Sequence, residues 1–115
     1  MNSDVSLDLE KWRKLPADKQ ILNIASELSR AKKWLAENNE ALVRSSLERA
    51  FDLVDASAET ARADGRYYLL RELLRLREFL GEFYSGSDLG VENFIPAIKN
   101  LLDLNIQTHE LHLEL

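Results

Sequence analysis

The sequence contains no cysteine, which excludes disulfides, thiolate catalysis and cysteine-based zinc sites. Long apolar runs are also absent, and none approaches the roughly 18 residues that a membrane span requires. The first residues lack a basic region followed by an apolar one, so no signal peptide is expected. The lack of cysteine fits a protein from a reducing compartment. We therefore predict a cytoplasmic protein without a membrane segment.

Basic residues are outnumbered, with 15 Lys and Arg against 20 Asp and Glu and a net charge of −5. A general nucleic-acid-binding protein would have a basic balance or a basic face, so this class is not expected. Hydrophobic residues make up 45% of the chain and charged residues 30%, which is typical of a folded globular protein. A length of 115 residues suits one domain with one core.

Glycine and proline are scarce, with four and two copies, and they stand where helices should begin or end. Pro16 and Pro96 suit the first turn of a helix, and Gly65 suits a left-handed helix cap. These breaks, together with Asn38-Asn39 and the loop at residues 85–90, predict helices at residues 7–14, 17–37, 40–63, 66–84 and 93–107.

Apolar residues recur every three or four positions in each long helix, as burial of one face requires. The expected core stripes are Ile21, Ile24, Ala25, Leu28, Ala31 and Leu35; Val43, Leu47, Ala50, Phe51, Val54, Ala58 and Ala61; Leu69, Leu73, Leu76, Leu80 and Phe83; and Phe94, Ile98, Leu101, Leu102 and Asn105. Helices joined by short loops pack as antiparallel neighbours. We predict an all-α, four-helix up-and-down bundle at residues 17–108, with a helical arm at 1–16 and a tail at 109–115.

An arginine falls inside the apolar arc of the helix at 66–84. At about 100° per residue, Arg77 projects between Leu70 and Tyr84. Such a side chain must reach solvent or find a carboxylate. Asp55 is the acidic residue nearest the apolar edge of the preceding helix, so we predict a buried Arg77–Asp55 ion pair, either structural or part of a ligand site.

The predicted helix at 40–63 has an acidic stripe of Glu48, Asp52, Asp55 and Glu59. Carboxylates at this spacing bind Mg²⁺ or Mn²⁺ in some helical bundles. A metal-dependent nucleotide hydrolase on Glu48, Asp52 and Asp55 is therefore one alternative. The competing interpretation is a solvated face neutralised by Arg44 and Arg62, and we favour it.

Basic and aromatic residues share the outer face of the helix at 66–84. Tyr67, Arg71 and Arg75 have the chemistry that contacts RNA phosphates and stacks on bases. Glu78 and Glu82 lie among them and weaken the positive field. An RNA-associated module is thus a second alternative, whereas a salt-bridged surface is the expected arrangement.

Trp34 lies away from the apolar stripe of its helix, on a face with Glu27 and Arg30. A large exposed indole is uncommon unless something covers it. The cover is either the N-terminal arm, through Trp12, or a second protein. Trp34, Arg30, Glu27 and Trp12 are therefore the candidate partner-binding residues.

Two stretches indicate a family. Residues 26–31 (SELSRA) with Trp34, and residues 47–55 (LERAFDLVD) with 71–80 (RELLRLREFL), resemble short uncharacterised prokaryotic all-helical proteins. The resemblance covers residues 10–95, and this helical plan is similar to HEPN-like four-helix bundles. HEPN ribonucleases have an arginine shortly before a histidine. No arginine stands five to seven residues before His109 or His112, so the resemblance implies an accessory role rather than a nuclease.

These patterns favour a non-enzymatic helical bundle that acts by protein association, as a homodimer or with one partner protein. No cofactor is expected, because no phosphate-binding glycine loop and no catalytic triad is indicated. Nucleic acid and membranes are not expected as partners.

Overall fold

The computed structural model describes residues 9–84 and 94–103, and these residues form five α-helices without a strand among them. The helices are α1 (Leu9–Lys14), α2 (Ala17–Ala36), α3 (Glu40–Ala63), α4 (Tyr67–Tyr84) and α5 (Phe94–Leu102). The predicted bounds of α2, α3 and α4 are correct to within one residue. The predicted end of α5 at residue 107 and the tail with His109 and His112 lie outside the described residues.

Local chemistry explains where the long helices begin and end. Pro16 precedes α2, where its missing N–H costs nothing. The Asn39 side chain caps α3 by accepting a 3.2 Å hydrogen bond from the backbone N–H of Leu42. Asn38 and Gly65 follow α2 and α3 and adopt left-handed backbone angles, with φ of 58° and 72°. Asparagine and glycine tolerate this conformation best, so both turns are encoded locally.

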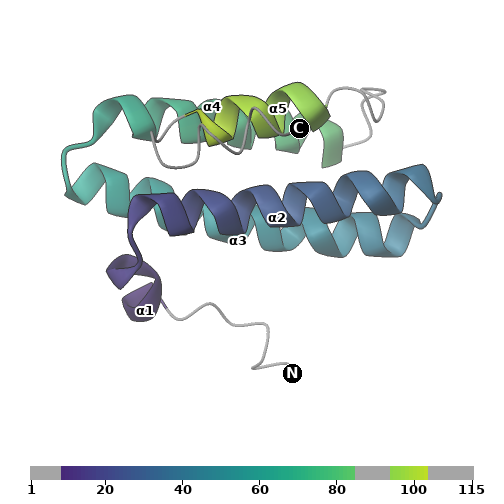
Figure 1. Cartoon of the computed structure of the whole chain (residues 1–115), viewed down its shortest axis with the longest axis horizontal. Helices are drawn as coiled ribbons and strands as arrows, with labels where there is room; N and C mark the ends of the chain where they lie inside the picture. The colour runs from purple at the N-terminus through teal and green to yellow at the C-terminus, as the bar shows by residue number, and fades with distance from the viewer. Residues whose placement is uncertain (1–8, 85–93, 104–115) are drawn as a thin grey trace.

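The helices α2, α3 and α4 run back and forth along one long direction, and α5 lies beside α2 and α4 (Figure 1). Direct contacts join α2 to α3, α3 to α4, α2 to α5 and α4 to α5. The short α1 lies at one end of this assembly and packs against α3. The chain is therefore all-α, as its sequence predicts.

The core lies between these helices and uses the predicted stripes. Its largest fully buried side chains come from three helices: Ile24, Leu28, Leu47, Leu73 and Leu80. On α3 the stripe includes the buried residues Ala50, Ala58 and Ala61, which let neighbouring helices approach closely. Burial of each large aliphatic side chain contributes roughly 1.5–3 kcal/mol. No helix within residues 9–84 and 94–103 combines the length and the apolar character needed to cross a membrane.

Candidate association surface on α4

The outer face of α4 exposes large side chains. Tyr67 and Tyr68 are 66% and 65% exposed, and Leu74 is 43% exposed. The opposite face of the same helix buries Leu73 and Leu80 in the core. Residues 67, 71, 74 and 78 follow one another at spacings of three and four, so they form one stripe along the helix. We call Tyr67, Arg71, Leu74 and Glu78 the α4 stripe.

The two charged members of the α4 stripe, Arg71 and Glu78, make no ion pair within the described part of the chain. They are seven residues apart, which is roughly 10 Å along a helix and too far for them to pair with each other. By contrast, Arg75 already pairs with Glu72 at 3.2 Å. Of the predicted RNA contacts, Tyr67 is exposed, and Arg71 is exposed and has no ion pair in the described part of the chain. Arg75, by contrast, is paired with Glu72.

Arg77 and Asp55 form the ion pair that the sequence predicts, across α4 and α3. Arg77 Nε lies 2.6 Å from Asp55 Oδ1, and Nη2 lies 3.4 Å from Oδ2. The hydrogen bond and charge of Asp55 raise the pKa of Arg77. The prediction of a buried pair is wrong, because the two side chains are 49% and 51% exposed. Arg77 passes over the ring of Phe51, with 5.4 Å from Cζ to the ring centroid, and its charged end reaches solvent.

The acidic stripe of α3 is divided among separate partners. Glu48 accepts a 2.8 Å hydrogen bond from the Tyr84 hydroxyl, and Asp55 pairs with Arg77. Glu59 pairs with Arg13 of α1 at 2.8 Å. In residues 9–84 and 94–103, no group of three acidic or histidine side chains is arranged to hold a metal ion. The metal-site alternative on Glu48, Asp52 and Asp55 therefore lacks the geometry that it requires.

The candidate partner-binding residues do not form one exposed surface. Trp12 is buried against α3, and Glu27 is only 7% exposed. Trp34 is half-buried and packs against the core, and Lys33 lies over its ring, with Nζ 4.7 Å from the centroid. The described part of the arm, residues 9–16, packs where α2 begins, roughly 25 Å from Trp34 by helix rise, so these residues do not cover that indole.

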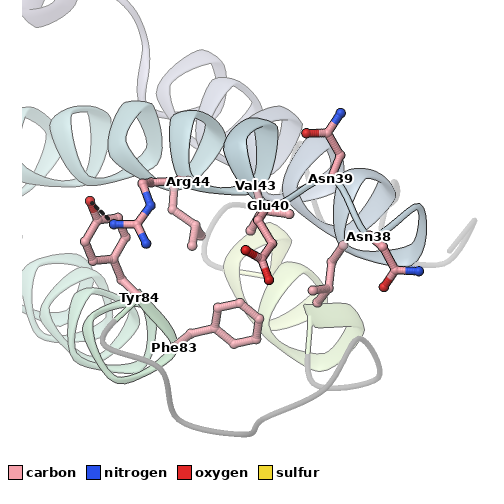
Figure 2. A pocket seen from close by; sticks show the side chains of 9 residues that line it. Asn38, Asn39, Glu40, Val43, Arg44, Phe83 and Tyr84 are labelled. Atoms are coloured by element: carbon pink, nitrogen blue, oxygen red, sulfur yellow. Dashed lines mark hydrogen bonds between the residues drawn. The ribbon is translucent and has the colours of Figure 1, made fainter.

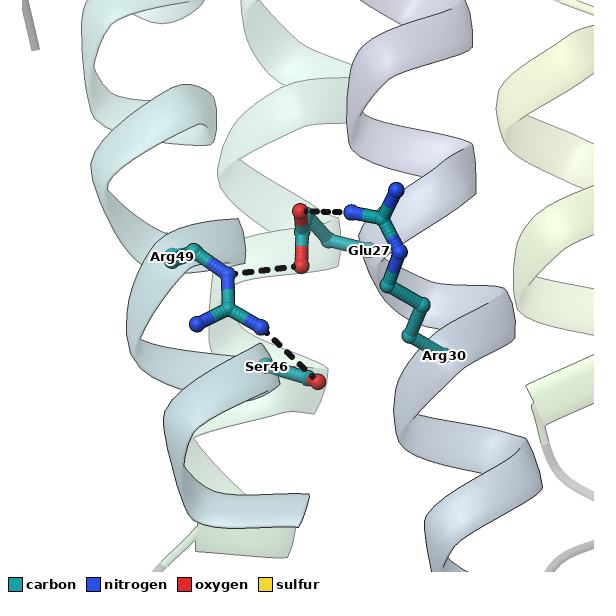
Figure 3. Close-up of polar contacts among 4 residues, drawn as sticks. All are labelled: Glu27, Arg30, Ser46 and Arg49. Atoms are coloured by element: carbon teal, nitrogen blue, oxygen red, sulfur yellow. Dashed lines mark hydrogen bonds and ion pairs between the residues drawn. The ribbon is translucent and has the colours of Figure 1, made fainter. Parts of the chain in front are cut away.

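Glu27 instead organises a charged network between α2 and α3, shown in Figure 3. One carboxylate oxygen is 2.5 Å from Arg30 Nη1, and the other is 3.0 Å from Arg49 Nε. Arg49 also donates a 3.3 Å hydrogen bond to the hydroxyl of Ser46, which is fully buried. Both carboxylate oxygens are thus paired, which offsets the cost of burying the charge.

A cavity of about 400 Å³ lies between the α2–α3 turn and the end of α4 (Figure 2). Sequence reasoning missed it, although the Asn38-Asn39 break marks its edge. Its lining combines the polar or charged residues Asn38, Asn39, Glu40, Arg44 and Tyr84 with the apolar residues Leu35, Val43, Leu47 and Phe83. Arg44 Nη1 lies 3.4 Å from the Tyr84 hydroxyl. Because Glu40 and Arg44 have opposite charges, the described lining selects no particular ligand charge.

No family model matches this sequence, and neither a curated protein nor a solved structure matches it. Function is therefore inferred from the chemistry of the described surfaces. Among these, the outer face of α4 has the most exposed aromatic and apolar side chains.

Proposed function

We propose that this chain is a non-enzymatic helical protein that acts by protein association through the outer face of α4. The observation that carries the proposal is the exposure of Tyr67, Tyr68 and Leu74 on that face. Tyrosine is enriched at protein interfaces because its ring buries a large area while its hydroxyl stays hydrated. Burying these three side chains against a partner would remove apolar surface that now faces water.

The charges of the α4 stripe support the same proposal. Arg71 and Glu78 have no ion-pair partner in the described part of the chain, on either side of the exposed Leu74. An apolar centre with charged groups at its edge is the usual composition of a protein–protein contact. Charges at such a rim select the partner and its orientation more than they add affinity.

We further propose that α2 to α5 make up an up-and-down four-helix bundle with α1 as an arm. The support is that α3 contacts α2 and α4, while α5 contacts the same two helices. In such a bundle α4 would be held along its inner face by Leu73, Leu76 and Leu80, which are buried. The outer face would then be presented by a fixed helix, so little ordering would be needed on binding.

Two other functions have less support. A nucleotide hydrolase on α3 would need its carboxylates together, whereas Glu48, Asp55 and Glu59 each have a different partner. An RNA-associated module would use Tyr67 and Arg71, but Glu78 lies on the same stripe and Arg75 is neutralised by Glu72. The implied likeness to HEPN-like accessory proteins is compatible with association and adds no residue to it.

Site-specific photocrosslinking tests the proposal. Leu74 is replaced by a photoreactive phenylalanine derivative in cells that naturally produce the chain, and adducts are identified by mass spectrometry. We expect one predominant adduct, either with the chain itself or with one other protein. Ser29, which is exposed on α2, is the matched control position. Equal crosslinking at positions 74 and 29 would overturn the proposal.

A further inference from the structure

We infer that the partner of the α4 outer face is a second copy of this chain, bound with the two α4 helices antiparallel about a two-fold axis beside Leu74. This inference rests on the proposed function and names its partner. The evidence is the order of side chains along the α4 stripe. When the stripe is paired with a copy that runs in the opposite direction, opposite charges meet.

The register follows from the positions of the charges. Arg71 lies three residues before Leu74 and Glu78 lies four residues after it. When a second α4 runs in the opposite direction about a point midway between residues 74 and 75, Arg71 of each copy lies at the same height as Glu78 of the other. The axis therefore generates two identical Arg–Glu pairs, as a two-fold interface must. Both side chains are available, since neither has an ion pair in the described structure.

The apolar side chains of the stripe agree with this register. Leu74 is next to the axis, so the two copies of this half-exposed leucine would pack against each other at the centre of the contact. Tyr67 is one turn beyond Arg71 and would cover the ion pair from its outer side. A parallel arrangement would instead set Arg71 against Arg71 and Glu78 against Glu78, and like charges at close range are destabilising. The pattern therefore selects the antiparallel pair.

The small size of the contact limits the strength of the dimer. An 18-residue helix is about 27 Å long. One helix face of this length is small compared with the roughly 800 Å² per partner of a stable interface. Interfaces of standard size have dissociation constants of about 1 µM or lower, so we expect this smaller contact to have one above about 1 µM. Concentrations up to about 500 µM are needed to observe the dimer.

Charge reversal tests the register by sedimentation equilibrium. The single variants Arg71→Glu and Glu78→Arg should each dimerise at least about tenfold more weakly, because each places two like-charged pairs in the contact. The double variant R71E/E78R should dimerise like the natural chain, since both pairs return with their signs exchanged. An equimolar mixture of the two single variants should form a heterodimer. Failure of the double variant to recover, or single variants that dimerise normally, would overturn the inference.

Controls separate this mechanism from general charge effects and from misfolding. Lys19→Glu on α2 is the matched control for Arg71→Glu: both lower the net charge of −5 by two, and Lys19 is exposed away from the stripe. It should leave dimerisation unchanged, and all variants should keep the circular dichroism of the natural chain. If the natural chain stays monomeric at 500 µM while position 74 still crosslinks to one other protein, the dimer inference is overturned and the proposed function is not. Loss of crosslinking at position 74 would overturn the proposed function as well.

Discussion

The indole Nε1 of Trp12 donates a 3.0 Å hydrogen bond to the Ser57 hydroxyl, although 45 residues separate the two along the chain. Both side chains are buried. The Gln20 amide donates a 2.9 Å hydrogen bond to the backbone carbonyl of Trp12 and so connects the arm to the start of α2. These contacts make α1 part of the folded unit, with Trp12 as its main point of attachment to α3.

Ser57→Ala should destabilise the protein by about 1–3 kcal/mol, because it leaves a buried indole N–H without an acceptor. Trp12→Phe should also destabilise it, since it removes the donor and part of the buried ring. In the double variant the two effects should not add, because they remove one shared hydrogen bond. Urea denaturation measures each free energy of unfolding. Ser29→Ala, at an exposed site, should change it by no more than about 0.5 kcal/mol.

Glu27→Gln should cost about 1–2 kcal/mol, because it weakens two charge-assisted hydrogen bonds while keeping the shape of the side chain. The cost should stay below the 3–5 kcal/mol typical of a broken buried pair, since Arg30 and Arg49 are about half exposed and regain water. Glu59→Gln removes the charge from the exposed pair with Arg13 and should cost less than about 1 kcal/mol. Equal effects of the two substitutions on urea denaturation would contradict the role assigned to Glu27.

Two glycines should respond to alanine in opposite directions. Gly81 is inside α4, and an added Cβ would meet no atom within 4 Å. Gly81→Ala should therefore stabilise the fold by about 0.5–1 kcal/mol, because alanine loses less backbone entropy in a helix. Gly65 also has open space, but its φ of +72° strains any side chain. Gly65→Ala should destabilise by about 1 kcal/mol. Thermal unfolding of both variants tests the contrast, which would fail if both shifted the melting temperature the same way.

Much of the helical plan could be predicted because its signals are local. The Asn39 cap, the left-handed Gly65 and the apolar spacing of three and four residues each act within one or two turns. The Arg77–Asp55 pair was also predictable, since Arg77 lies inside the apolar arc of α4 and Asp55 lies near the apolar edge of α3. Its exposure was not, because the long Arg77 side chain reaches solvent from an inward position.

Burial at α2 could not be predicted from one stripe. Both α3 and α5 contact α2, so more of its circumference is covered than its apolar residues indicate. Glu27 is buried where it pairs with Arg49 of α3, and Trp34 is half-buried against the core. A helical wheel gives the direction of a side chain but not which neighbour occupies that direction.

The sequence by itself determined an all-α chain, the ends of its long helices and the apolar stripes that meet in the core. Those features depend on backbone preferences and on periodicity, which act over a few residues. Only the tertiary structure decided that Trp12 attaches to Ser57, that Glu27 is enclosed by two arginines, and that Leu74 stays exposed on the outer face of α4. These outcomes depend on which helices become neighbours, and packing over the whole chain determines that choice.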